Sequence, residues 1–359
     1  MKSNYSLSLL NKLEKSRKVV KVFDTSIFVK SLVKGKKGGL DQREFELSKK
    51  TIKDRLAQKV NVETIRNSQG FPSINLNTVE MITDCIYLSY EKFTFKVWVY
   101  YPRKPFDMAK RKAIIYIHGG SFFAGSPFEQ ENMLKLLSER GNCVIFNVDI
   151  SLAPEARFPI AINEVLTLIS YIKKNYKQYK VDLDNIFISG DSSGANQALA
   201  VYQLTKEIKV KGMILYYPSL ALTFDLPYKW NESDYVFPEK QREYIIPRLI
   251  LGRSDEKGRN SLVSLIMSIY LSDKDNPKDP LLSPLFYDLK KYPKMLIFGA
   301  EYDGLRIQYE YFVSALRESK VKVDYIRYNG VHHGFNNKLG YFPQVEDSVN
   351  EIVRYINRD

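Results

Sequence analysis

The sequence predicts an α/β protein built on a mostly parallel sheet with helices on both faces. From residue 112 onward, short apolar runs alternate with longer stretches in which apolar residues recur at helical spacing. The composition is that of a globular protein, with 44% hydrophobic and 26% charged residues. A length of 359 residues fits one large domain that carries an insertion.

The first part of the chain reads differently from the rest. Residues 1–75 are basic and expected to be mainly helical, and Asp24 and Thr25 are suited to cap a short helix that ends at Gly35. Residues 69–77 have the composition of a loop. Runs 79–90 and 93–102 are rich in β-branched and aromatic residues and are expected to pair as a hairpin.

The alternating elements then follow in order, with one interruption. Residues 224–278 are polar at their edges and helical in the middle, at 261–271, so we interpret them as an insertion on the sheet. The strands are expected at 112–120, 143–151, 185–190, 211–220, 294–303 and 322–328, and the helices at 133–140, 161–176, 195–207, 307–319 and 345–357.

Charge and cysteine content narrow the possible functions. The formal net charge is +13, but the lysines are scattered and no nucleic-acid-binding motif is present, so we expect no nucleic-acid partner. Cys85 and Cys143 lie in apolar runs and are expected to be buried thiols. Without a signal-like apolar segment or a stretch long enough to span a membrane, we expect a cytoplasmic protein. Contact between the basic N-terminal region and a membrane or partner remains open.

The most informative motif runs from Gly190 to Gly194. It reads Gly-Asp-Ser-Ser-Gly and fits G-x-S-x-G between a strand and a helix, the context of a nucleophile elbow. Ser192 is therefore the candidate nucleophile, and the amide of Ser193 is a candidate oxyanion donor at the helix N-terminus. Asp191 is interpreted as a structural support.

A second motif, His118-Gly119-Gly120-Ser121, ends a buried strand. Glycines at a strand end expose backbone amides, as an oxyanion hole requires. We assign the amides of Gly120 and Ser121 to this hole, and include Gly119, which shapes the loop. His118 is expected to orient the loop.

A base and an orienting acid should follow the nucleophile along the chain. Asp303 comes directly after a strand, and the adjacent His332 and His333 follow the last strand. Each residue alone is a weak signal, but a serine, an acid and a histidine in this order at strand ends form a specific combination.

These motifs resemble the hormone-sensitive-lipase-like branch of the α/β-hydrolases. That branch carries HGGG, a GDSAG-type elbow, D-P-L and H-G-F; the last two are represented by residues 303–305 and 333–335. Segments 152–164 and 279–286 also match, so the resemblance covers about residues 80–358. It selects His333 as the base. Ser121 in place of the third glycine and Gly304 in place of the proline are departures that affect substrate preference and local rigidity.

The resemblance implies an α/β-hydrolase fold: an eight-stranded, mostly parallel sheet with helices on both faces and a helical cap. Residues 1–75 would form an N-terminal helical cap region, and residues 76–359 the catalytic domain with the cap insertion at 224–278. The expected activity is hydrolysis of small to medium acyl, aryl or acetyl esters by Ser192, His333 and Asp303, without cofactor or metal.

Several alternatives stay open. An amide or lactone could be cleaved by the same groups. A small-molecule receptor on this fold would lack the catalytic histidine, and the presence of His333 favours an enzyme. Glu155, like Asp191, is expected to support the elbow. The sequence does not decide between a monomer and a dimer.

Overall fold

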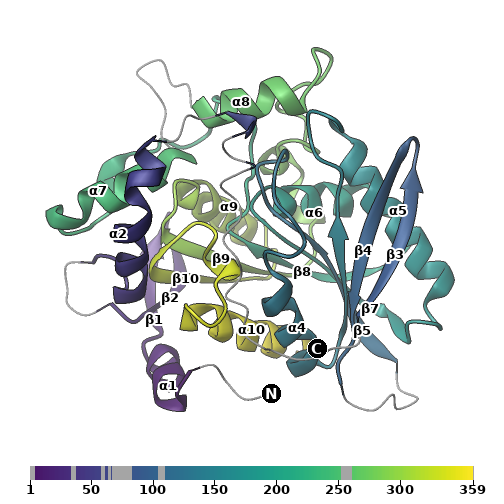
Figure 1. Ribbon diagram of the computed structural model, residues 1–359, viewed down its shortest axis with the longest axis horizontal. Coiled ribbons are helices and arrows are strands. Elements are labelled where there is room, and N and C mark those ends of the chain that lie inside the picture. Colours follow the sequence, from purple (N-terminus) through teal and green to yellow (C-terminus); the bar gives the residue numbers. More distant parts are fainter. Residues whose placement is uncertain are drawn as a thin grey trace.

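The computed structural model describes residues 5–33, 38–57, 61–63, 66, 83–103, 110–251 and 261–358. Its centre is a ten-stranded sheet in the order β1-β2-β10-β9-β8-β7-β5-β6-β4-β3 (Figure 1). The strands are β1 Lys18–Val22, β2 Thr25–Ser31, β3 Thr83–Tyr90, β4 Phe93–Tyr100, β5 Arg111–Ile117, β6 Val144–Asp149, β7 Val181–Asp191, β8 Val210–Tyr216, β9 Met295–Tyr302 and β10 Val323–His332.

The predicted α/β architecture is confirmed. Strands β5 to β10 pair in parallel with one another, and β2 pairs in parallel with β10. The expected hairpin forms as the antiparallel pair β3–β4, and β4 runs antiparallel to β6. The helices are α1 Leu7–Lys15, α2 Gln42–Ala57, α4 Glu131–Gly141, α5 Ile160–Asn175, α6 Ser193–Leu204, α7 Arg242–Ile245, α8 Ser261–Tyr270, α9 Arg306–Glu318 and α10 Pro343–Ile356.

Strand order places the helices on two faces. The chain moves from β5 to β6 in one direction along the sheet and then crosses back to β7, β8, β9 and β10 in the other. Because parallel crossovers are right-handed, this reversal puts α4 on one face and α5, α6 and α9 on the opposite face. Helix α10 packs against α4, and α5 packs against α6 (Figure 1). The apolar residues of the central strands are buried between these layers, and all of β9 is buried.

The N-terminal prediction is partly wrong, because residues 25–31 form a strand and not a capped helix. Phe23 and Asp24 have φ values of 46° and 57° and make the two-residue turn of the β1–β2 hairpin. Ile27 and Val29 are buried on one face, at the two-residue spacing of a strand. Because the hairpin joins the sheet beside β10, the sheet has two strands more than expected.

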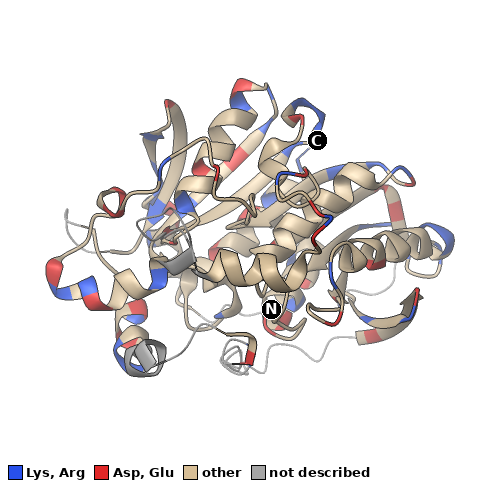
Figure 2. Cartoon of the chain, turned by 90° about the horizontal axis from the view of Figure 1, so that it is seen from above, with Lys and Arg blue, Asp and Glu red and all other residues tan. Residues whose placement is uncertain are grey.

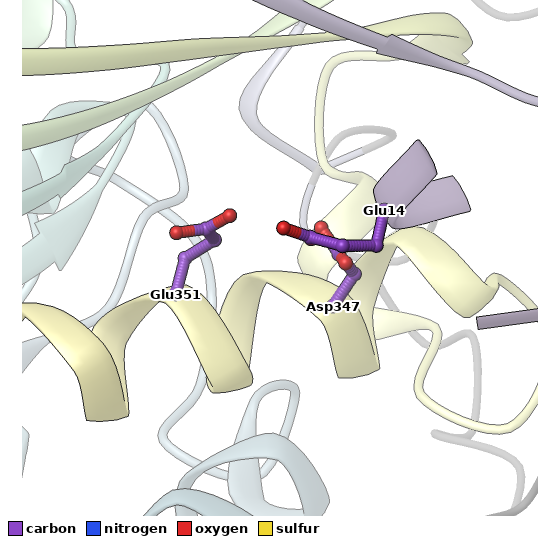
Figure 3. Close-up of side chains that lie close together, drawn as sticks. All are labelled: Glu14, Asp347 and Glu351. Carbon is purple, nitrogen blue, oxygen red and sulfur yellow. The ribbon is translucent and has the colours of Figure 1, made fainter. Parts of the chain in front are cut away.

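Lys30 fastens this hairpin to the last helix. Its side chain is fully buried, and its ammonium group donates hydrogen bonds to Glu14, to Asp347 at 2.8 Å and to Glu351 at 2.7 Å. Figure 3 shows the three carboxylates converging from α1 and α10. Burial lowers the pKa of Lys30, but these carboxylates outweigh that effect and raise it. The acidic cluster therefore holds an ammonium ion supplied by the chain itself.

The insertion packs over the carboxyl edge of the sheet. Leu262, Ile266 and Tyr270 of α8 form a cluster with Phe122 and Leu222. Helix α7 lies beside α2 (Figure 1). The boundary expected at residues 75 and 76, the loop at 69–77 and the helix end at Gly35 lie outside the described residues, and the division into a cap region and a catalytic domain stays a prediction.

The structure bears on three further expectations, which concern the distribution of charge, the cysteines and membrane-spanning helices. Lys and Arg residues are distributed over many elements and alternate with acidic residues (Figure 2). Both cysteines are free thiols; Cys143 is buried and Cys85 is half-buried. None of the described helices combines the length and the apolar character needed to cross a bilayer.

Candidate active site

Ser192 lies in a tight turn between β7 and α6. Its φ of 52° and ψ of −118° are strained for a residue with a side chain. The Ser192 amide donates to the carbonyl of Tyr216 at 3.0 Å, and its own carbonyl accepts from the amides of Asn196 and Ser219. These bonds hold the strained conformation in place.

The glycines of the motif are required by close backbone approach. A Cβ at Gly194 would lie 2.2 Å from the carbonyl oxygen of Ile117, and one at Gly190 would lie 2.8 Å from the same atom. Real Cβ atoms do not approach that closely, so β5 can lie against the turn only if both positions lack a side chain. The spacing of the motif thus reflects the packing of β5 against the turn from β7 to α6.

The structure brings Ser192, His333 and Asp303 together. His333 Nε2 lies 2.9 Å from Ser192 Oγ, and His333 Nδ1 lies 2.7 Å from Asp303 Oδ2. Asp303 follows β9 and is fully buried, while the His333 side chain keeps 20% of its surface exposed. The Asp303 carboxylate also accepts hydrogen bonds from the Leu305 amide at 2.8 Å and the Tyr309 hydroxyl at 3.4 Å. These bonds aim the carboxylate at the imidazole.

The neighbouring histidine faces elsewhere. His332 is the last residue of β10 and is buried, with Nδ1 at 3.2 Å from the Tyr302 carbonyl and Nε2 at 3.7 Å from Glu44. It therefore lies against β9 and α2, on the side of β10 away from Ser192. His333 follows the strand end, and its ring packs at 4.4 Å from the ring of Tyr217.

The loop after β5 turns sharply next to the elbow. Gly120, Ser121 and Phe122 have φ values of 128°, 56° and 69°. The Gly120 carbonyl accepts from the amides of Phe123 and Ala124, which closes the turn. Within the described part of the chain, the amides of Gly120, Ser121 and Ser193 donate no hydrogen bond. They are available to a ligand near Ser192.

Gly119 is a correction to the predicted oxyanion set. Its amide donates to Asp191 Oδ1 at 3.0 Å and is therefore not free to bind a ligand. A Cβ at Gly119 would lie 2.5 Å from the Asp191 carboxylate, so this glycine allows the acid to approach the loop. Gly119 shapes the loop, and Asp191 holds the loop against the elbow.

His118 and Asp191 are both buried, and each contacts Gly119 in the loop after β5. Burial lowers the pKa of His118, so its imidazole is neutral near pH 7, and Nδ1 lies 2.8 Å from the Gly119 carbonyl. Burial raises the pKa of Asp191, although the hydroxyl of Tyr116 and the amide of Gly119 favour the carboxylate. Neither group has a recorded contact with Ser192 Oγ.

A chain of buried hydrogen bonds behind the site is not visible in the sequence. The Tyr217 hydroxyl donates to Asn336 Oδ1, Asn336 Nδ2 donates to the Tyr116 hydroxyl at 3.2 Å, and that hydroxyl donates to Asp191 at 2.8 Å. The chain connects β5, β7, β8 and the segment after His333. The tyrosines of strand 211–220 were predicted only as strand residues, because nothing local shows which partner each hydroxyl meets.

Glu155 supports the loop after β5 and not the elbow. Its carboxylate pairs with Arg66 at 2.7 Å, and Arg66 donates 2.6 Å hydrogen bonds to the carbonyls of Phe123 and Ala153. Arg66 is another residue that sequence reasoning missed. Its pairing joins the segment between β2 and β3 to the loop that follows β5.

A cavity of about 310 Å³ opens beside Ser192. This volume is near the lower limit for small-molecule sites. Most of its walls are apolar, supplied by the loop after β5 and by the insertion with its helix α8. The lining includes Ser121, Phe122, Leu222, Tyr228, Lys229 and Ile266.

Residues 114–337 match the family model of the alpha/beta hydrolase fold. The chain belongs to this family. Two crystal structures of an esterase from the archaeon Pyrobaculum calidifontis are similar, at 27% and 26% identity with TM-scores of 0.71 and 0.73, over 88% and 89% of this chain and 98% of each esterase. An arylesterase structure superposes with a TM-score of 0.72 at 23% identity over 88% of this chain and 98% of its own, which shows the shared fold.

Proposed function

We propose that the protein is a serine carboxylesterase for small to medium esters, with Ser192, His333 and Asp303 as its triad. The main support for the proposal is that the His333 ring lies between the other two side chains. Its nitrogens are 2.9 Å from Ser192 Oγ and 2.7 Å from Asp303 Oδ2. This is the geometry in which a histidine removes the proton from an attacking serine while the acid fixes its tautomer. The esterase activity named for the Pyrobaculum structures supports the same chemistry.

In the first half of the proposed reaction, Ser192 Oγ attacks the ester carbonyl and His333 Nε2 takes its proton. The carbonyl oxygen becomes an oxyanion that accepts hydrogen bonds from the amides of Gly120, Ser121 and Ser193. Losing one such donor typically costs about a hundredfold in rate or more. His333 then gives the proton to the departing alcohol, which leaves an acyl group on Ser192.

In the second half, water replaces the alcohol. His333 accepts a proton from the water as it attacks the acyl group, and returns that proton to Ser192 Oγ when the acid leaves. The buried Asp303 carboxylate stabilises the imidazolium form in both halves. The residues supply every proton transfer themselves, so the proposed cycle uses no cofactor.

The test is hydrolysis of p-nitrophenyl acetate and butyrate by the wild type and by Ser192→Ala. We expect the substitution to abolish turnover while the circular dichroism spectrum and melting temperature stay unchanged. A Ser192→Ala variant with the wild-type rate would contradict the assignment of the nucleophile.

A fluorophosphonate probe tests the nucleophile independently of substrate. We expect peptide mapping to find the label on Ser192, because only an activated serine attacks such a probe. A folded sample that takes up no label would favour the alternative, a small-molecule receptor. An amide and lactone panel, run beside the esters, separates the remaining hydrolase alternatives.

A further inference from the structure

Among the residues that the structure describes, one cationic side chain, Lys229, lines the cavity beside Ser192; the other described lining side chains are apolar, hydroxyl, amide or aromatic. Lys229 is exposed and lies in the part of the insertion that precedes α8 in the chain. One cation on an otherwise neutral and mostly apolar wall gives the cavity an electrostatic preference for anions.

The residues on either side of Lys229 are anchored to the catalytic region. The Tyr228 hydroxyl accepts a hydrogen bond from Gln308 Nε2 at 2.9 Å. Trp230 Nε1 donates to the Tyr235 hydroxyl at 3.1 Å, and that hydroxyl donates to the carbonyl of Asp303 at 2.8 Å. Lys229 is therefore carried by a segment whose position is fixed relative to the triad.

Lys229 also differs from several charged residues of the same insertion, which are ion-paired. On the same insertion, Asp225 pairs with Lys278, and Glu232 pairs with Arg242. Within the described part of the chain, no carboxylate lies within ion-pair distance of Lys229. Its ammonium group is left for a ligand, and pairing with a ligand would not require breaking an existing ion pair.

We propose that Lys229 selects esters that carry a carboxylate in addition to the ester group. The inference rests on the proposed esterase function and names the substrate class of that site. The carboxylate pairs with the ammonium group at the cavity wall while the ester carbonyl lies at Ser192. The volume of about 310 Å³ restricts the class to small molecules.

The experiment compares matched esters that differ only in charge. 4-Nitrophenyl hydrogen adipate and its carboxamide counterpart have nearly the same shape, and place the charge on the acyl side. 4-Carboxyphenyl butyrate and 4-carbamoylphenyl butyrate place it on the alcohol side. We expect the wild type to prefer the anionic member of one pair by about three- to tenfold in kcat/KM. An effect of this size is typical of one partly exposed charge pair. The preference should weaken as salt concentration rises.

Variants assign the preference to this lysine. Lys229→Met should bring the ratio within that pair to about one, Lys229→Arg should retain it, and Lys229→Glu should reverse it. Lys274→Met removes an exposed lysine that does not line the cavity, and should leave the ratio unchanged. Because each ratio is taken within one variant, differences in protein quality cancel.

The outcomes separate the two proposals. Hydrolysis of all four esters with ratios near one in the wild type overturns the selection by Lys229 and leaves the esterase function standing. An anionic preference that survives in Lys229→Met also overturns it. Failure of the folded wild type to hydrolyse any ester, including p-nitrophenyl acetate, overturns the esterase function itself.

Discussion

Replacing Lys30 with methionine tests how the N-terminal hairpin is held. The variant keeps the volume of the aliphatic stem but removes the ammonium group that Glu14, Asp347 and Glu351 share. Asp347 and Glu351 are each only 3% exposed. Glu351 keeps its ion pair with Arg354 at 2.7 Å, but among the described residues Asp347 pairs with Lys30 alone and would remain buried without a cation. Breaking a buried ion pair by removing one partner costs about 3–5 kcal/mol. We expect a loss of this size in the free energy of unfolding at pH 7.5.

The loss should depend on pH with a definite sign. Burial raises the pKa of Asp347, and losing Lys30 would raise it further above that of the unfolded chain, whereas Glu351 keeps its ion pair with Arg354. Below the pKa of Asp347 in the unfolded chain, the folded and the unfolded state both bind the proton and the loss of stability is absent. The loss develops as the pH rises and this carboxylate ionises. The destabilisation should therefore be smaller at pH 5 than at pH 7.5.

The assay is urea unfolding followed by tryptophan fluorescence at the two pH values. Lys21→Met, an exposed position on the same hairpin, is the matched control and should change stability by less than about 0.5 kcal/mol. Adding Asp347→Asn to Lys30→Met should restore part of the loss. If Lys30→Met lies within about 1 kcal/mol of the control at pH 7.5, the cation does not hold the cluster as described.

Three further predictions concern the site. Asp303→Asn should lower kcat for p-nitrophenyl butyrate by about ten-thousandfold with an unchanged fold, because the tautomer of His333 is no longer fixed; a loss below tenfold would contradict the triad. Gly194→Ala should lower the free energy of unfolding by at least about 2 kcal/mol, measured in urea, since its Cβ would lie 2.2 Å from the Ile117 carbonyl oxygen. Burial lowers the pKa of His118, so folding opposes its protonation and stability falls as the pH drops below about 6.5. The stability gap between the wild type and a less stable His118→Gln variant should therefore narrow from pH 7.5 to pH 5, and a constant gap would show that His118 titrates normally.

The parts of the structure that could be predicted depend on local chemistry. A G-x-S-x-G turn needs its glycines where β5 approaches, so Gly190 and Gly194 mark the elbow in the sequence as clearly as in space. Parallel strands bring the loops that follow them to one edge of the sheet. The sequence therefore placed Ser192, Asp303 and His333 on that edge, and the structure places them in contact.

The features that the sequence did not predict depend on contacts between residues far apart in the chain. A short helix was predicted after Asp24 and Thr25 because these residues resemble a helix cap and Gly35 a helix end, while the strand pattern of β2 is completed only by pairing with β10. Gly119 was included in the predicted oxyanion set as the residue that shapes the loop; the acceptor of its amide, Asp191, lies 72 residues away. The contact between Tyr217 and Asn336 spans 119 residues. Side-chain pairing over such separations is set by the complete fold and leaves no local signature.

The attachment of the hairpin has a consequence for how the protein is made. Lys30 meets Glu351 across 321 residues, and β2 finds its neighbour only when β10 exists. At about 5–20 residues per second on the ribosome, the edge strand waits roughly 16 to 64 seconds for its partners. During that time its unsatisfied backbone groups and the lone ammonium must stay in water or with a chaperone, and the sheet edge closes as a late event that requires the last helix.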